Sequence, residues 1–343
     1  MNPSVRRLED ARQGDWEAYV DTCPTATFFH RAGWREVLEK AYGHATHYLY
    51  AECDGRITGV LPLGHIRSRL FGNALVSTPF CVYGGVAASD ESSARVLEDA
   101  ACDLARELRV DHLELRNREP RNPDWPGKDL YVTFRKSIDP EPDQNLLAVP
   151  RKQRAMIRKG IKNGLRSSVD DQIEAFYAIY ADSVHRLGTP VFPRRYFRLL
   201  KETFGAACEI TRVTTLDGRD VSAVLSFRFR DEILPYYGGG LPIARQLAGY
   251  DFLYWEVMRR ACERGTQVFD YGRSKRGTGS FSFKKNWGFT PEALHYRYHL
   301  VRSATVPDVN PLNPRYRLFI AIWKRMPLRL ANSLGPMVAR SLG

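Results

Sequence analysis

The sequence lacks long apolar segments, and this absence argues against several cellular locations. No apolar run approaches the roughly 18 residues that a membrane-spanning helix needs. The first residues, MNPSVRRLEDARQGDW, contain no apolar stretch of the kind found in secretory signal peptides. We therefore expect a cytoplasmic protein, with a peripheral position on the inner membrane face as the alternative.

The cysteines and histidines form none of the usual metal-binding patterns. The six cysteines are scattered and form no C-x-x-C pair, which argues against a zinc ribbon and against a disulfide-stapled secreted domain. His44 and His47 have no further ligands nearby, and His295 and His299 lie in ALHYRYHLV, which alternates like a strand. No G-x-S-x-G nucleophile motif is present. We expect neither a metal site nor a covalent nucleophile.

Acidic residues are fewer than basic ones. The 343 residues include 51 Lys and Arg against 39 Asp and Glu, which gives a net charge of +12. Such an excess favours an anionic partner, either nucleic acid, a nucleotide-bearing substrate or a membrane surface, although it also serves solubility alone. The hydrophobic share of 43% is ample for a folded core, and the length exceeds that of one ordinary domain.

The first half of the chain contains a series of elements typical of an α/β unit. A predicted helix over residues 28–43 is followed by two strands joined at Asp54-Gly55, a favourable hairpin turn. A strand that ends in VYGGV comes next, followed by a helix over residues 92–110 and the short strand DHLELR.

The second half repeats these elements in the same order. Helices between residues 173 and 205 precede two strands joined at Asp217-Gly218 and a strand that ends in YYGGG. A helix over residues 249–265 and the strand QVFDYGR follow. The shared order predicts two copies of one unit.

Two proline-containing segments suggest boundaries. IDPEPDQNLLAVP, residues 138–150, holds three prolines and three acidic residues, which is typical of a linker. We therefore expect domains at 1–140 and 141–302, and a separate C-terminal segment at 303–343 that starts with the extended tether VPDVNPLNPRYR. Residues 316–343 mix large apolar and basic residues, so they either lie in an anionic membrane interface or cap the core of the domain.

Two segments are basic and contain no acidic residue. RKQRAMIRKGIKNGLR, residues 151–166, has seven basic residues; on a helix, Ile157, Ile161 and Leu165 fall on one side. A separate stripe either binds phosphate or is an ordinary solvated face, and it consists of Arg151, Arg154, Arg158 and Lys162. YGRSKRGTGSFSFKKNWGF, residues 271–289, has five basic residues and four glycines, which predicts a flexible loop able to hold an anion.

Three segments together resemble a known family. They are VPRKQRAMIRKGIKNGL, the run from YYGGG to GYDFLYWEVMRRACERGTQVFDYGR, and GTGSFSFKKNWGF. Their order resembles that of the Fem-type acyl and aminoacyl transferases, and the tail NPRYRLFIAIWKRMPLRLANSLGP is similar to FemAB-related proteins associated with exosortase, PEP-CTERM and exopolysaccharide systems. The resemblance implies an α/β (α+β) fold of two tandem GNAT-like domains, with mixed, largely antiparallel sheets and flanking helices.

The resemblance also implies an acyltransferase without a covalent intermediate or a tightly bound cofactor. An amine of an envelope or exopolysaccharide precursor, borne by a sugar, peptide or lipid, would attack an activated acyl carbonyl directly. Aminoacyl-tRNA and acyl-CoA both stay open as donors, because LPIARQLAGYDFLYW departs from the glycine spacing of acetyl-CoA loops. The alternatives are a non-catalytic RNA-binding protein and a membrane-peripheral scaffold with a transferase fold.

Candidate site residues follow from the resemblance. Asp270 would orient the acceptor amine or take its proton, or else bind backbone or an arginine; Lys284 would neutralise phosphate or transition-state charge. One of Tyr236 and Tyr237 would point into the cleft and the other into the core, since side chains alternate along a strand, and Tyr237 is the candidate. Donor phosphates would meet Arg151, Arg154 and Arg158 of the stripe, together with Arg245, Gly249, Arg273 and Lys285.

Overall fold

The structure is a computed structural model. It describes residues 3–68, 72–307 and 314–341, and for residues 314–317 it describes the backbone alone. The predicted tether over 306–317 therefore falls partly outside the described residues.

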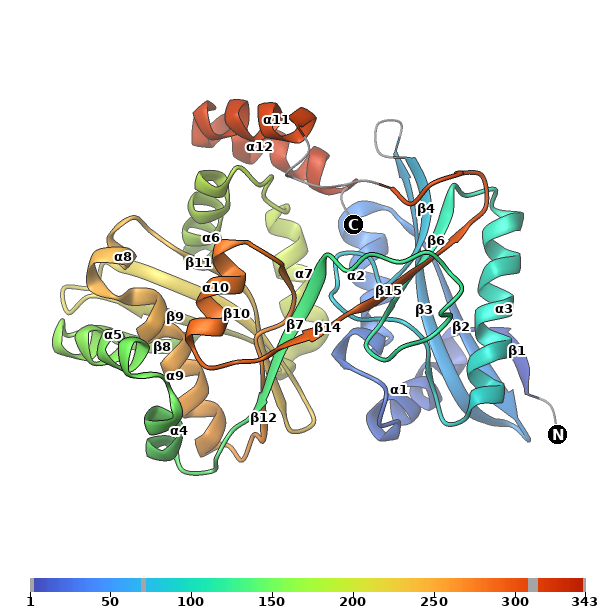
Figure 1. The fold of residues 1–343 in the computed structure, drawn as a ribbon, viewed down its shortest axis with the longest axis horizontal. Coiled ribbons are helices and arrows are strands. Elements are labelled where there is room, and N and C mark those ends of the chain that lie inside the picture. Colours follow the sequence, from blue (N-terminus) through green and yellow to red (C-terminus); the bar gives the residue numbers. More distant parts are fainter. Residues whose placement is uncertain (1–2, 69–71, 308–313, 342–343) are drawn as a thin grey trace. The chain divides into compact units, whose positions relative to one another are not determined.

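Contacts within the chain define two compact units (Figure 1). The first comprises residues 1–129, 293–309 and 339–343, and the second comprises residues 130–292 and 310–338. Each unit combines a mostly antiparallel sheet with flanking helices, which confirms the predicted mixed α/β class.

The sheet of the first unit follows the order β1-β2-β3-β4-β6-β15, and β5 pairs with β3. β4 and β6 are parallel, whereas the other pairs are antiparallel. Its strands are β1 (Ser4–Arg7), β2 (Ala45–Cys53), β3 (Arg56–Ser68), β4 (Gly72–Ser77), β5 (Ala87–Ala88), β6 (His112–Asn117) and β15 (His295–Leu300). Its helices are α1 (Gln13–Thr22), α2 (Gly33–Tyr42) and α3 (Glu91–Glu107).

The sheet of the second unit follows the order β13-β7-β12-β11-β10-β9-β8, and β14 pairs with β7. Its strands are β7 (Tyr131–Ser137), β8 (Arg166–Asp170), β9 (Cys208–Thr214), β10 (Asp220–Phe229), β11 (Glu232–Gly240), β12 (Val268–Asp270), β13 (Ser274–Lys275) and β14 (Pro291–Ala293). Its helices are α4 (Pro142–Ala148), α5 (Arg151–Lys162), α6 (Ile173–Leu187), α7 (Arg194–Phe204), α8 (Ile243–Leu247), α9 (Gly249–Glu263), α10 (Gly279–Asn286), α11 (Pro314–Arg325) and α12 (Leu328–Ala339).

Both predicted hairpins are confirmed. Asp54 and Gly55 join β2 to β3 with φ of 50° and 75°, the left-handed geometry of a two-residue turn. Asp217 and Gly218 lie between the antiparallel strands β9 and β10, and Gly218 has a φ of 82°. An Asp-Gly pair predicts such a turn because glycine adopts positive φ without steric penalty.

Two strands join sheets that their sequence positions do not suggest. Residues 131–137, which precede the expected boundary at 140, form β7 and pair with β12 in the second sheet. Residues 295–300, which precede the expected boundary at 302, form β15 and pair with β6 in the first sheet. Alternation along a strand shows which side chains share a face, but it does not show which strand is the neighbour.

Two segments expected to be irregular are helical. In the expected linker, α4 begins with Pro142 at a helical position where proline loses no hydrogen bond, and the Asn145 amide donates to the Asp139 carbonyl over 2.7 Å. The prediction of a flexible loop over 271–289 was wrong for residues 279–286, which form α10. The Thr278 hydroxyl accepts from the Phe281 N–H over 3.4 Å and so caps this helix.

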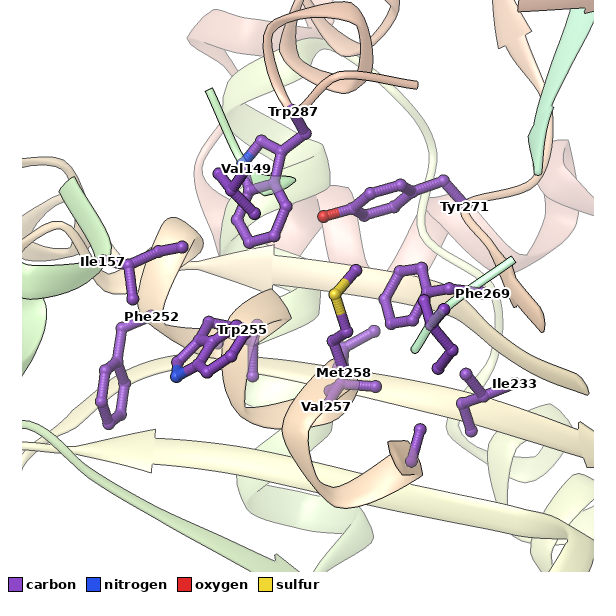
Figure 2. Packing of buried hydrophobic residues seen from close by; sticks show 14 of the residues in the cluster. Val149, Ile157, Ile233, Phe252, Trp255, Val257, Met258, Phe269, Tyr271 and Trp287 are labelled. Carbon is purple, nitrogen blue, oxygen red and sulfur yellow. The ribbon is translucent and has the colours of Figure 1, made fainter. Parts of the chain in front are cut away.

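The core of the second unit lies between α9 and the sheet. Figure 2 shows Met258 of α9 beside Phe269, with Trp255 nearer to Phe252, and Tyr271 and Trp287 belong to the same buried cluster. The Tyr271 and Trp287 rings have their centroids 5.9 Å apart and meet edge to face. This buried contact packs the end of α10 against the residue that follows β12.

The C-terminal helices pack on the second unit. α11 contacts α6, and His185 of α6 donates through Nε2 to the Met326 carbonyl over 2.9 Å. A Cβ on Gly188 would lie 2.5 Å from Ile320. Within the described residues, no helix is both long enough and apolar enough to cross a bilayer.

Candidate active site

A cavity of about 420 Å³ lies in the second unit, where two parallel strands separate. β11 and β12 pair through Glu232–Val268 and Ile233–Phe269. Further along, Gly238 and Tyr271 both line the cavity. The remaining lining residues come from α5, α6, α8, α9 and α10 or their ends: Met156, Ser183, Leu187, Ala244, Arg245, Ala248, Tyr250, Asp251, Tyr254, Gly279, Ser280, Phe283 and Lys284.

The glycines of YYGGG allow two tyrosines to approach the end of β11. A Cβ on Gly238 would lie 2.8 Å from the Tyr254 hydroxyl, and one on Gly240 would lie 2.8 Å from the ring of Tyr250. The Tyr250 hydroxyl also donates to the Gly240 carbonyl over 3.2 Å. Because these glycines have no side chain, α9 packs closely against this strand and forms one wall of the cavity.

The N-terminus of α9 also faces the cavity. Ala248 occupies the N-cap position with a φ of 60°, and its side chain forms no capping hydrogen bond. The first N–H groups of a helix carry partial positive charge, so an uncapped N-terminus suits an anion. Gly249 is buried beside this position and is not part of the lining; a Cβ there would lie 2.5 Å from Val221.

Asp251 is the functional candidate that the sequence reasoning missed. It lines the cavity, is 8% exposed, and accepts a hydrogen bond from the Trp287 Nε1–H over 3.0 Å. Burial raises the pKa of this carboxyl, and the bond from Trp287 partly opposes that shift. An aspartate in the first turn of a helix is so common that the sequence offers no signal to single it out.

Lys284 lines the cavity, but its ammonium group is bound to the backbone. Its Nζ donates to the carbonyls of Tyr271, Gly272 and Arg273 over 2.7, 3.0 and 3.0 Å. Burial lowers the pKa of Lys284 to about 7, while the charge of Asp270 favours the ammonium form. Three carbonyl acceptors also favour that form. Through these three hydrogen bonds Lys284 stabilises the turn after β12.

Asp270 lies outside the cavity lining, in a buried network. It is 0% exposed and accepts from the Gly272 N–H over 2.7 Å and from Arg135 Nη1 over 2.8 Å. Arg135 also forms an ion pair with Glu232, at the start of β11. These partners correspond to the structural alternative, in which the carboxylate binds backbone and an arginine.

Tyr237 belongs to an aromatic cluster rather than to the cavity. Its hydroxyl lies 2.8 Å from that of Tyr196, and its ring meets those of Phe192 and Phe197 edge to face. The next residue, Gly238, is the one that lines the cavity. Because successive side chains of a strand point to opposite faces, the neighbouring position faces the cavity instead.

The basic stripe lies on a different face of α5 from the cavity. Arg151, Arg154 and Arg158 line an open hollow of about 490 Å³ together with Ala155, Lys159 and Lys162. Met156 is the residue of α5 that reaches the cavity. Ile157 and Leu165 are buried as predicted, whereas Ile161 is 51% exposed, because the helix ends one residue after it.

Of the other predicted phosphate-binding side chains, only that of Arg245 lines the cavity. Arg245 is exposed. The Arg273 guanidinium lies over the ring of Tyr131, 4.7 Å from its centre, and Lys285 is exposed outside the lining. The structure therefore brings together Arg245 and Lys284, with Asp251 in addition. Across the described ranges, no cluster of three or more His, Cys, Asp and Glu could hold a metal ion.

Comparison with protein families supports a transferase. Residues 151–285 match the acetyltransferase (GNAT) domain family. This segment includes all of the cavity lining and both basic segments up to Lys285. Among curated protein sequences, none matches the chain significantly.

Several solved structures share the fold of the chain. The crystal structure of FemX has a TM-score of 0.69 at 14% identity, covering 92% of this chain and all (100%) of that one. The C-terminal domain of a putative lysylphosphatidylglycerol synthetase from Agrobacterium fabrum has a TM-score of 0.57 at 12% identity, covering 84% and 91%. A tandem GNAT protein from the clavulanic acid biosynthesis pathway has a TM-score of 0.54 at 12% identity, covering 88% and 100%.

These similarities agree with the two sheets of the structure. The chain consists of GNAT-like folds in tandem, and residues 151–285 of its second unit are similar to the acetyltransferase (GNAT) domain family.

Proposed function

We propose that the protein is an acyltransferase that passes an acyl or aminoacyl group from an activated donor to an amine. The observation that carries the proposal is the cavity between β11 and β12, which is lined entirely by residues of the GNAT-matched segment and includes the buried carboxylate of Asp251. Direct transfer requires donor and acceptor to meet in one hollow, where correct orientation supplies much of the rate.

The proposed step makes one bond and breaks one bond. The amine nitrogen attacks the acyl carbon, and the bond from that carbon to the sulfur or oxygen of the donor breaks. Asp251 holds the amine and takes the proton that it loses, while the donor leaves with the electron pair of the broken bond; burial raises the pKa of Asp251, which makes the carboxylate a stronger base. Backbone N–H groups of β11 beyond Ile233, where the strand has left β12, would donate to the developing oxyanion.

The donor in this proposal is acyl-CoA, the usual donor of GNAT domains, or aminoacyl-tRNA. The uncapped start of α9 and Arg245 would meet phosphate beside the cavity. Arg151, Arg154 and Arg158 line a separate hollow, which suits the longer backbone of tRNA. Lys284 is proposed as a positioning residue that holds the turn after β12, and Asp270 supports the same turn through the Gly272 N–H.

The proposed acceptor is an amine on a sugar, peptide or lipid-linked precursor of the envelope or of an exopolysaccharide. This part of the proposal rests on the resemblance of the sequence motifs to FemAB-related proteins of the exosortase-associated kind. A lipid-linked acceptor would require the enzyme to work at a membrane surface.

A donor screen tests the proposal. The full chain is incubated with acetyl-CoA, longer acyl-CoA esters and a mixed aminoacyl-tRNA pool, each with amino sugars and short peptides as acceptors, and products are identified by mass spectrometry. Acylated amine with one donor class is the expected result. Salt-sensitive tRNA binding without acyl transfer from any donor would instead support a non-catalytic RNA-binding protein.

Asp251→Asn tests the assigned base. We expect the transfer rate to fall by about 10²–10⁴-fold, because the amide cannot take the proton. Asp143→Asn is the matched control, since Asp143 also lies in the first turn of a helix but is exposed on α4. Equal rates in the two variants would remove Asp251 from the proposed mechanism while leaving the reaction itself intact.

A further inference from the structure

The C-terminal helices keep large apolar side chains exposed even though their inner faces are already packed. On the inner side, Trp323 and Ala331 are 3% and 2% exposed. Gly335 lies so near the second unit that a Cβ on it would be 3.0 Å from the Val191 nitrogen. The helices are therefore docked without using their remaining apolar residues.

Those remaining residues form a stripe along α12. Leu330, Leu334 and Met337 follow the spacing i, i+4, i+7, which places them on one face of a helix. They are 48%, 38% and 72% exposed. A row of large apolar side chains on the outer face of a helix is unfavourable in water and is typical of a surface that binds something.

The outer face of α11 has the same character. Leu318 and Ile322, one turn apart, are 65% and 56% exposed. Arg325, three residues after Ile322 and so on the same face of the helix, is also exposed. Each of the two helices thus offers apolar side chains next to a basic one.

The charge of this segment is entirely of one sign. Residues 309–343 contain six basic residues and no acidic one. Arg329 is exposed and, one residue before Leu330 on α12, lies along one side of the apolar stripe. Apolar side chains flanked only by cations match the interface of an anionic bilayer, where acyl chains lie beneath negatively charged head groups.

We infer that α11 and α12 bind the surface of an anionic lipid bilayer, lying flat rather than crossing it. Leu318, Ile322, Leu330, Leu334 and Met337 would enter the boundary between head groups and acyl chains, and the neighbouring arginines would meet lipid phosphates. The inference goes beyond the proposed transfer reaction and does not depend on it, because binding to vesicles needs neither donor nor acceptor.

Flotation of the full chain with lipid vesicles tests the inference. We expect the protein to float with vesicles that contain phosphatidylglycerol, and to stay at the bottom with phosphatidylcholine alone or at high salt. Leu334→Asp/Met337→Asp should abolish flotation. Arg325→Glu/Arg329→Glu should weaken partitioning by about tenfold or more, since each basic residue near the surface contributes roughly a fivefold effect.

A matched double variant controls for the loss of exposed apolar area. Leu147→Asp/Leu216→Asp removes two leucines that are 58% and 68% exposed elsewhere on the second unit, and it should float like the unchanged protein. Thermal unfolding of each variant should stay close to that of the parent, because all four side chains are exposed. No flotation of the parent, or equal flotation of the two double variants, would overturn the inference. So would self-association of the parent that Leu334→Asp/Met337→Asp abolishes, since the stripe would then be an interface between copies.

Discussion

The two units differ at the place where their parallel strands separate. In the first unit, β4 and β6 pair from Ala74–His112 to Val76–Glu114, and the loop after β4 then returns to β6. The Gly85 N–H donates to the Arg116 carbonyl over 3.1 Å, so the chain itself occupies this place. In the second unit the corresponding place is the cavity. The loop after β4 thus fills the space beside the parallel strands in the first unit, whereas the second unit keeps a cavity there, which is the proposed substrate site.

The N-termini of the helices beside these sites, α3 in the first unit and α9 in the second, also differ. α3 begins with Asp90, whose carboxylate accepts from the Ser93 N–H over 2.8 Å and neutralises the helix end. A pocket of about 350 Å³ there includes Glu91 and Arg121, which form an ion pair with each other. α9 begins with Ala248 and has no such cap. The N-cap side chain of α3 therefore binds an N–H group of its own helix, whereas that of α9 does not, and the acidic residue in the first turn of α9 is Asp251.

The basic residues that hold the two turns also differ. In the first unit, Arg116 donates to the Cys81 carbonyl over 2.7 Å and pairs with Glu114. In the second unit, Lys284 performs the comparable task with three carbonyls. An arginine stays charged at every ordinary pH, but a buried lysine does not.

Filling the cavity of the second unit should have the largest effect on the transfer rate. Gly238→Leu would put a side chain into the cavity, as the loop does in the first unit, and transfer should fall by about 10²-fold or more. The nearest obstacle is the end of the Tyr254 side chain, so the free energy of unfolding should fall by only about 1–3 kcal/mol. Transfer rates and urea unfolding measure both quantities.

Gly14→Leu is the control for this substitution, because nothing lies within 4 Å of a Cβ at Gly14. It should leave transfer unchanged. Full activity of Gly238→Leu would mean that the reaction takes place outside the cavity.

Exchanging the helix caps should have an intermediate effect. Ala248→Asp would bring a carboxylate to the start of α9, and the KM for the donor should rise about fivefold, since the charge opposes that of phosphate. Ala248→Asn, which suits a φ of 60° and carries no charge, should change KM less. Asp90→Ala in the first unit should lower the free energy of unfolding by about 1 kcal/mol without changing KM. A KM that responds equally to both substitutions at Ala248 would exclude donor phosphate from this helix end.

Titration of Lys284 should have the smallest effect, a change of the free energy of unfolding with pH. Its pKa falls from 10.5 to about 7 on folding, so between these values the unfolded chain binds more protons and stability should rise with pH. The difference in unfolding free energy between the unchanged protein and Lys284→Met should therefore grow in favour of the former from pH 7 to pH 10. Urea unfolding at several pH values measures it. A constant difference would show that the three carbonyls keep the ammonium charged throughout.

Local signals in the sequence predicted the fold well. The Asp-Gly turns, the alternation of the strands and the repeated order of elements each depend on neighbouring residues, and the structure confirms them. Segments 138–150 and 271–289 were misjudged because prolines and glycines at helix ends resemble those of loops. Pro142 and Thr278 instead begin helices.

The candidate site was harder to predict than the fold. Of the residues predicted from the sequence, Arg245 and Lys284 line the cavity, and their roles there stay predictions. The choice of carboxylate was not decidable from sequence, because Asp251 and Asp270 both stand in apolar surroundings. Which one faces a hollow depends on Trp287, Arg135 and the separation of two strands, none of which is local.

By itself, the sequence determined what depends on short stretches of chain: the repeated α/β unit, the turns, the positive charge and the basic faces of individual helices. Only the tertiary structure decided which strand joins which sheet, which unit keeps an open gap, and which side chains face it. The physical reason is that backbone propensity and periodicity act over a few residues, whereas burial and pairing join residues far apart in the chain.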